Sequence, residues 1–399
     1  MSEHPSRSMG PGRSPLRGLL RGLALTALAA VLAACGGNAG GTTPTASTSK
    51  KVTVTLSTDL TDPIPGTNML PWQGVWIPAF EKAHPNITVK VVGGSSGSTD
   101  QALYDRVVAA EQAHQAPPVD ITDASILPQL AEAHEGLKLS SSEIPRMKEV
   151  DPALVSQDQS EAMPYRGSSV VLAYNTQYVH TPPRTLSGLI SWIKGHPGKF
   201  SYNSPSTGGS GQGFVQAVVD QYVPHSDAAT LETGYQPSVE SSWQRGLNEL
   251  HSLDGDIYQN GHYLSCNDQT LQLLGNGAIW MAPVWSDGAS AAKASGLLPS
   301  SVHFATVTPA FPGGPADLMV LKGTPDRQAA FTLLNWMLSP TAQQLVAKYM
   351  QGYPGTEWRY APASVRKEFK GIESNYAPFW SAKFTADLNA KWQSAVPQS

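Results

Sequence analysis

The chain has 399 residues, 40% of them hydrophobic and 15% charged, and its formal net charge at pH 7 is −4. Because Lys and Arg do not cluster after the first 21 residues, the sequence excludes a nucleic-acid-binding protein. About 350 residues remain beyond the N-terminal leader and tether described below, more than one hydrophobic core usually serves. We therefore expect two lobes.

The first 34 residues have the pattern of an export signal. Four arginines precede an apolar run over residues 23–32, which is too short for a transmembrane helix of about 20 residues. The run ends in Leu32-Ala33-Ala34-Cys35, which resembles the bacterial lipobox, whose Cys becomes the lipidated first residue. We predict a signal peptide over residues 1–34, lipidation of Cys35 and anchoring to the outer face of the cytoplasmic membrane. The alternative is an ordinary secretory signal that contains a Cys.

Residues 35–50 are rich in Gly, Ser and Thr, which predicts a flexible tether. The chain has two Cys, so lipidation of Cys35 leaves Cys266 without an intrachain partner. An exported protein with one remaining thiol has no disulfide and depends on its core for stability. We expect Cys266 to be a small buried hydrophobic residue rather than a nucleophile.

Strands and helices alternate from residue 51 onward. Residues 51–56 alternate apolar and polar side chains, as a half-buried strand does. Between residues 100 and 112, apolar side chains recur on one helical face. The other expected elements are a helix around residues 76–80 that ends at His84-Pro85-Asn86, strands at 87–92 and 118–123, and a helix at 126–131. This alternation predicts an α/β layer with a largely parallel sheet.

The pattern restarts with a strong strand at residues 168–174. After it we expect helices at 186–193 and 214–222, and buried strands at 278–282 and 302–307. Two helices then follow in tandem. Thr324 and Ser339 are their predicted N-caps, because each precedes a Pro at the first helical position.

Several landmarks occur in a fixed order along the chain. A Ser-rich turn follows the second expected strand. After it come Val119-Asp120-Ile121-Thr122-Asp123-Ala124-Ser125, Met163-Pro164-Tyr165-Arg166-Gly167, Leu172-Ala173-Tyr174-Asn175, Gly277-Ala278-Ile279-Trp280-Met281-Ala282-Pro283-Val284-Trp285, Phe331-Thr332-Leu333-Leu334-Asn335-Trp336-Met337-Leu338-Ser339-Pro340 and Gly352-Tyr353-Pro354-Gly355. This series resembles the family 1 extracellular solute-binding proteins of ABC importers, over residues 51–355. Residues 184–202 are most similar to a poorly characterised branch near the iron, thiamine and polyamine binders.

The resemblance implies an α/β, two-lobed type II periplasmic-binding-protein fold with a ligand cleft between the lobes. Lobe 1 is expected to comprise residues 51–164 and 316–348, and lobe 2 residues 165–315 and 349–399. The implied function is the capture of a small solute outside the cytoplasm and its delivery to an ABC permease in the membrane. We expect a monomer that needs no cofactor.

Binding groups are expected in loops at the strand ends of both lobes, because the ligand must contact both for closure to depend on it. In lobe 1 the candidates are Asp59, Trp72, Ser95, Ser96 and Ser125. The Gly/Ser loop at 93–99 separates a strand from a helix, where backbone N–H groups bind an anion. A plain Ser/Thr helix cap is the alternative.

In lobe 2 the loop over residues 204–213, with Ser206 and Thr207, repeats this arrangement but lacks the Lys of a nucleotide-binding P-loop. The further candidates are Tyr165 at the crossing between lobes, Trp285 and Asp287, which combine an aromatic face with a carboxylate, and Tyr353. The alternatives are packing for any single Trp and fixing of a turn for Tyr353.

The ligand itself stays open among a polyamine, a thiamine-like cation and a sugar. Iron is disfavoured, because iron binders in related branches present adjacent tyrosines and this chain has no Tyr-Tyr pair. The histidines are scattered and lack the spacing of a zinc site, so no metal is expected.

One motif indicates a different class. Residues 93–97 match the Gly-x-Ser-x-Gly nucleophile elbow, which would make the protein a lipid-anchored serine hydrolase with Ser95 as nucleophile and a His such as His262 or His303. Only one strand and one helix precede this turn, which leaves little sequence for an oxyanion-hole loop. The protein is therefore predicted not to be an enzyme.

Overall fold

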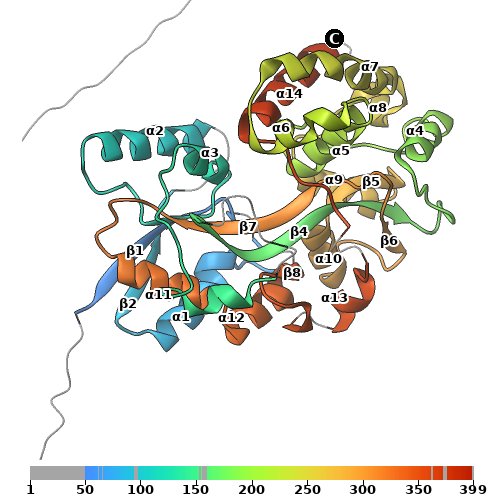
Figure 1. Ribbon diagram of the computed structural model, residues 1–399. Helices are drawn as coiled ribbons and strands as arrows, with labels where there is room; N and C mark the ends of the chain where they lie inside the picture. Colours follow the sequence, from blue (N-terminus) through green and yellow to red (C-terminus); the bar gives the residue numbers. More distant parts are fainter. Residues whose placement is uncertain are drawn as a thin grey trace, which may run out of the picture. The chain divides into compact units, whose positions relative to one another are not determined.

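Figure 1 shows a computed structural model of the protein, which describes residues 50–397 except 62, 65, 94–97, 152–153, 155–159, 361–362 and 372–374. The chain divides into one unit over residues 1–48 and a second over residues 49–399, and the fold below is that of the second. The predictions on the signal peptide, Cys35 and most of the tether lie outside the described residues, as do those on Ser95 and Ser96. Within the described ranges, no helix is long and apolar enough to cross a membrane.

The first three strands are parallel. β1 (Val52–Ser57) pairs with β2 (Ile87–Val91) on one side and with β3 (Ile121–Thr122) on the other. Val54 and Leu56 of β1 are fully buried, as their alternation with threonines predicts. β3 is shorter than the predicted strand at 118–123, because it pairs with β1 over two residues only.

The remaining strands are antiparallel to their neighbours, so the prediction of a largely parallel sheet is wrong beyond β3. The long strand β4 (Ala162–Asn175) is central. Its first half pairs with β7 (Gly313–Val320) and β8 (Tyr353–Pro354), and its second half with β5 (Met281–Trp285) and β6 (Val302–Ala305). The order along the mixed sheet is β2-β1-β3-β7-β4-β5. Buried apolar runs do not encode strand direction, which the chain path decides.

Helices cover both faces of the first half of the sheet. Figure 1 shows α2 (Ser98–Gln112) and α3 (Leu127–Glu132) above the strands, with α1 (Ile77–Ala83), α11 (Arg327–Met337) and α12 (Pro340–Leu345) below them. The shorter elements here are η1 (Pro71–Trp76), η2 (Pro145–Glu149) and η7 (Val346–Met350).

The two tandem helices differ in how they begin. Ser339 caps α12 as predicted, because its hydroxyl accepts a hydrogen bond from the Ala342 N–H at 3.3 Å and Pro340 is the first helical residue. The prediction for Thr324 is wrong, since α11 begins at Arg327 after Asp326. The Thr324 hydroxyl instead donates to a carboxylate oxygen of Asp120.

The second half of the sheet also has helices on both faces. In Figure 1, α5 (Gly209–Asp220), α7 (Gln244–Ser252) and α14 (Ala382–Ala395) lie above β4, and α10 (Ser286–Ala294) and α13 (Ala363–Glu368) below it. The other elements are α4 (Leu186–Gly195), η4 (His225–Asp227), α6 (Ala228–Thr233), η5 (Pro237–Trp243), η6 (Asp254–Asp256), α8 (Tyr258–Gly261), α9 (Asn267–Gly275) and η8 (Trp358–Tyr360). Cys266 is a free, half-buried residue at the start of α9.

The buried apolar side chains form separate clusters on the two halves of the sheet. Trp76, Phe80 and Leu318 belong to a cluster that packs β1 and β7 against α1 and α11. Phe214 and Trp392 belong to a cluster between the second half of β4 and helices α5 and α14. β4 contributes residues to both clusters and is the physical connection between two hydrophobic cores.

Candidate functional site

Polar side chains gather where β1 and β3 end. Because these strands are parallel, their carboxyl ends meet at the same edge of the sheet. Oδ2 of Asp59, two residues after β1, accepts a hydrogen bond from the Ser125 N–H at 2.6 Å. The structure thus brings together two of the residues predicted for lobe 1.

Asp123, directly after β3, accepts hydrogen bonds from two other side chains at this edge. Its Oδ2 accepts hydrogen bonds from the indole Nε1 of Trp72 and from the hydroxyl of Tyr165, both at 2.9 Å. Its other oxygen, Oδ1, is buried and makes no hydrogen bond with a described residue. Burial raises the pKa of the Asp123 carboxyl above its ordinary value, whereas the Thr58 side chain, the hydrogen bonds from Trp72 and Tyr165 and the Arg166 charge favour its ionised form.

Trp72 and Tyr165 reach the site only through Asp123. Both side chains are fully buried, and they form an aromatic cluster with Trp76, whose ring centroid lies 4.9 Å from that of Trp72 and 5.8 Å from that of Tyr165. Burial raises the pKa of the Tyr165 phenol well above its ordinary value, so Tyr165 stays a hydrogen-bond donor. The buried side chains of Trp72 and Tyr165 therefore fix the position of the Asp123 carboxylate through their hydrogen bonds.

The hydrogen bonds continue across the sheet from a β-bulge at Tyr165. The register of β4 and β7 shifts between Pro164 and Arg166, so Tyr165 is the extra residue on β4. Arg166 then donates from Nε to the Tyr165 hydroxyl at 3.3 Å and from Nη1 to Oδ2 of Asp287 at 2.7 Å. Burial lowers the pKa of Arg166, but Tyr165 and Asp287 together raise it above its ordinary value.

Asp287 lies in the first turn of α10, and both of its carboxylate oxygens accept hydrogen bonds. Its Oδ1 accepts hydrogen bonds from the Ser168 hydroxyl at 2.7 Å and from the Gly288 N–H at 2.8 Å. A carboxylate in this position is stabilised by the helix dipole. Asp123, Tyr165, Arg166 and Asp287 therefore form one continuous chain of hydrogen bonds from β3 to α10.

Tyr353 is buried on β8, which pairs with β4 at Arg166. Its hydroxyl lies 2.8 Å from the Ser169 hydroxyl, and its ring packs edge-on against Trp358 and Phe369. These contacts agree with the structural alternative for Tyr353, which is to fix the segment that follows η7.

The loop before α5 lies against Trp285. A Cβ atom at Gly209 would be 2.7 Å from Cζ2 of the Trp285 ring, so only glycine permits this approach. Asn203 holds the loop, since its Oδ1 accepts hydrogen bonds from the Gly211 N–H at 3.0 Å and from the Ser210 hydroxyl at 2.8 Å. The half-buried Trp285 ring is therefore held at the amino end of a helix.

Ser206 and Thr207 are exposed on the same loop. The Ser206 hydroxyl lies 3.1 Å from that of Ser204, and the Thr207 hydroxyl donates to the Ser204 carbonyl at 3.1 Å. Neither caps α5, whose N-cap residue is Gly208 without a side-chain hydrogen bond. The structure thus does not bear out the helix-cap alternative for this loop.

The sequence predictions overlooked Asp123 and Arg166. A carboxylate immediately after a buried strand was a usable signal for Asp123. No local pattern distinguished Arg166, because its role depends on Asp287, 121 residues away. Among the described residues, no group of three or more His, Cys, Asp and Glu is arranged to hold a metal ion.

Comparison with known proteins identifies the fold. Residues 76–370 match the family model described as bacterial extracellular solute-binding protein. The spermidine/putrescine ABC transporter substrate-binding protein PotD from Streptococcus pneumoniae has 13% sequence identity and a TM-score of 0.63, covering 87% of this chain and 99% of PotD. The sequence has no match among curated proteins.

Two further solved structures are similar. An ABC transporter protein from Clostridium perfringens has 16% identity and a TM-score of 0.60, and apo ferric ion-binding protein A from Pasteurella haemolytica has 13% and 0.59. Each alignment covers 86% of this chain and 98% of the other. At such identities these likenesses show the fold, which is the predicted two-lobed α/β fold.

The family match extends over most of the chain and confirms the resemblance seen in the sequence. It supports solute binding outside the cytoplasm and not the serine-hydrolase alternative, whose nucleophile Ser95 lies outside the described residues. The chain belongs to the family of bacterial extracellular solute-binding proteins.

Proposed function

We propose that the protein is the substrate-binding component of an ABC importer and that its ligand is a small organic cation bound beside Asp123. The observation that carries the choice of ligand is the charge of the site. Asp59, Asp123 and Asp287 contribute three carboxylates, against the single guanidinium of Arg166. A cation offsets this excess of negative charge, and a neutral sugar leaves it uncompensated.

The half-buried ring of Trp285 supports a cationic ligand as well. An indole face attracts an ammonium group, and desolvation strengthens that attraction to about 2 kcal/mol. The similar structure from Streptococcus pneumoniae is described as a spermidine/putrescine binder. Polyamines and thiamine-like cations are thus the leading ligand classes, and a sugar is the alternative that the binding experiment distinguishes.

Binding couples to lobe closure in this proposal. The lobes are residues 51–164 with 316–348 and residues 165–315 with 349–399, and the distribution of buried clusters on the two halves of β4 supports this division. Asp123 presents the ligand-binding oxygen of lobe 1 and Trp285 presents the aromatic face of lobe 2, whereas Asp287 is occupied by Arg166 and Ser168 and contributes only its charge. Because the ligand contacts both lobes only when they are closed, it shifts the equilibrium toward the closed form.

The cellular setting follows from the N-terminal sequence. Cys35 carries the lipid, residues 35–50 form the tether, and the monomeric binding protein delivers its ligand to an ABC permease from the outer face of the cytoplasmic membrane. Replacement of Cys35 by Ser should release the exported protein from membranes in a fractionation experiment. Continued membrane association of this variant would argue against the lipid anchor.

A thermal-shift panel with putrescine, spermidine, thiamine and sugars tests the ligand class. A cation should raise the melting temperature, because ligand that binds only the folded state stabilises it. Asp123→Asn should weaken cation binding at least about tenfold, or roughly 1.4 kcal/mol. Trp285→Ala should weaken it several-fold without unfolding the protein.

Asp105→Asn on the exposed face of α2 is the matched control and should bind normally. A sugar that binds while every cation fails would replace the cation proposal. Unchanged cation affinity in Asp123→Asn would remove the proposed site.

A further inference from the structure

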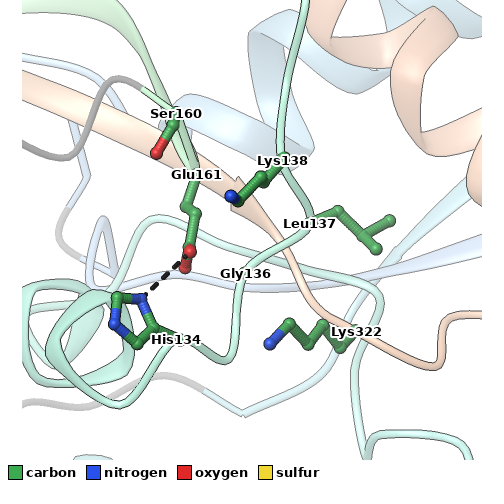
Figure 2. Close-up of a pocket in the computed structure, with 7 residues that line it drawn as sticks. All are labelled: His134, Gly136, Leu137, Lys138, Ser160, Glu161 and Lys322. Atoms are coloured by element: carbon green, nitrogen blue, oxygen red, sulfur yellow. Dashed lines mark hydrogen bonds and ion pairs between the residues drawn. The ribbon is translucent and has the colours of Figure 1, made fainter.

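A pocket lies at the start of β4 and the end of β7. It measures about 440 Å³ and is lined by His134, Gly136, Leu137, Lys138, Ser160, Glu161 and Lys322 (Figure 2). Glu161 directly precedes β4, whose Ala162 pairs with Met319 near the end of β7. Thr122 of β3 and Ala162 of β4 both pair with Met319 of β7, so Glu161 and Asp123 lie two strands apart and are offset by two residues, which separates their backbones by roughly 12 Å.

Glu161 is a buried carboxylate, and one of its two oxygens accepts no hydrogen bond from a described residue. Its side chain is 7% exposed, and Oε1 lies 3.2 Å from Nδ1 of His134. Oε2 is buried and has no hydrogen-bond partner among the described residues. A buried carboxylate oxygen without a donor is energetically costly, so the site is complete only when a donor is bound there.

The backbone of Gly136 packs closely against Glu161. A Cβ atom at Gly136 would lie 2.9 Å from Cβ of Glu161 and 3.2 Å from its Oε2. Gly136 is held in place by its antiparallel bridge with Leu321, which follows β7. Gly136 therefore packs so closely against Glu161 that a side chain at this position would displace the Glu161 carboxyl group.

Two lysines supply the opposite charge. Figure 2 shows the Glu161 carboxyl group between His134 and the Lys138 ammonium, with Lys322 entering the pocket from the far side. Neither lysine has an ion-pair partner within 4.0 Å in the described part of the chain. The pocket therefore combines an acceptor without a hydrogen bond in its wall with two ammonium groups, of which Lys322 also acts on the Glu135 carboxyl, whose pKa burial raises and this lysine lowers.

We propose that this pocket is a second ligand site, which binds a small zwitterion of the α-amino acid class. The ligand's ammonium group, which has three donors and no acceptor, satisfies Oε2 of Glu161. Its carboxylate accepts charge-assisted hydrogen bonds from Lys138 and Lys322. A ligand with one of these groups alone leaves either the buried oxygen or the two lysines unpaired.

Isothermal titration calorimetry of the full-length protein with L-alanine, ethylammonium and propionate tests this assignment. L-alanine should bind, and each single-charge analogue should bind at least about tenfold more weakly. Glu161→Gln keeps the shape of the side chain and should weaken L-alanine binding at least about tenfold. Gly136→Ala, whose Cβ would lie 2.9 Å from Cβ of Glu161 and so displace that side chain, should also weaken it.

Lys322→Met changes a residue at the pocket wall without removing a buried charge, so it keeps the test valid if Glu161→Gln does not fold. This variant should lose several-fold in affinity for L-alanine. Glu143→Gln is the matched control, because this partly exposed carboxylate pairs with Arg327 elsewhere in lobe 1.

Asp123→Asn should leave L-alanine binding unchanged, which separates this pocket from the proposed cation site. Three results would each overturn the proposal: no heat with L-alanine, equal affinity for ethylammonium, or loss of L-alanine binding in Asp123→Asn.

Discussion

Asp123 follows β3 and Glu161 precedes β4, and the side chains that donate hydrogen bonds to these two carboxylates differ in burial. Asp123 receives its two donors from fully buried aromatic side chains. Glu161 receives its single donor from His134, whose side chain is 78% exposed. The first carboxylate is therefore held by the core, whereas the second depends on a donor that is exposed to solvent.

This difference teaches how the fold separates stability from binding. The donors of Asp123 pack within the hydrophobic core, so they cannot be removed without a large loss of folding free energy. The donor of Glu161 contributes little to the core, so the Glu161 pocket is expected to change its contacts at small cost. Four substitutions test or refine this contrast.

Trp72→Ala has the largest expected effect. Removal of a fully buried indole from the cluster with Trp76 and Tyr165 should lower the free energy of unfolding by about 3–5 kcal/mol. His134→Ala, which removes the corresponding donor to Glu161 but no buried apolar surface, should cost less, about 1–2 kcal/mol. Urea denaturation of the two variants measures both values, and equal losses would contradict the contrast.

Arg166→Met should be next. It leaves Asp287 nearly buried without its guanidinium partner, which should cost about 3 kcal/mol of unfolding free energy. The double variant Arg166→Met/Asp287→Asn should recover part of this loss. Lys383→Met breaks a more exposed contact, 3.8 Å from Glu132, and should change stability by less than about 0.5 kcal/mol. A similar loss in both single variants would show that the Arg166–Asp287 ion pair contributes no more stability than an exposed one.

Asp220 extends the comparison to lobe 2, because it too accepts a hydrogen bond from an indole, that of Trp380, at 3.0 Å. Burial raises the pKa of the Asp220 carboxyl from 3.8 to about 6. The folded state therefore binds the proton more tightly than the unfolded state, and the stability contributed by protonated Asp220 is lost as the pH rises through about 6.

Asp220→Asn keeps an oxygen that can accept from Trp380 and removes the ionisation. Above pH 7 this variant should be more stable than the parent protein by about 1–2 kcal/mol. The gain should disappear near pH 4, which thermal melts across this pH range measure. Asp105→Asn, at an exposed position, should show no such dependence. A gain of equal size at pH 4 and pH 8 would show that ionisation of Asp220 is not its cause.

Tyr165→Phe should have the smallest effect of the four. It retains the ring in the aromatic cluster and removes one hydrogen bond to Asp123, which should cost about 1 kcal/mol. Tyr174→Phe is the control, because the Tyr174 hydroxyl makes no hydrogen bond with the described residues, and it should be close to neutral. A loss well above that of Trp72→Ala would mean that the hydroxyl, and not the packed rings, secures Asp123.

Local sequence patterns were sufficient for the elements that depend on local interactions. The alternation in β1, the apolar face of α4 and the Ser339-Pro340 cap all appear in the structure near their predicted positions. The ordered series of motifs also identified the family, which the family model confirms. Asp59 and Ser125, both candidates from the sequence, lie together because both follow neighbouring parallel strands, and their role in binding stays a prediction.

Only the tertiary structure decided the rest, since it depends on contacts between residues distant in the chain. The antiparallel insertion of β7 beside β3, the engagement of Thr324 by Asp120 and the pairing of Arg166 with Asp287 have no local signal. The same holds for the Glu161 pocket, which requires α3, the start of β4 and the end of β7 to meet. Sequence determines local propensity and burial, whereas the partner of a buried charge is set by the path of the whole chain.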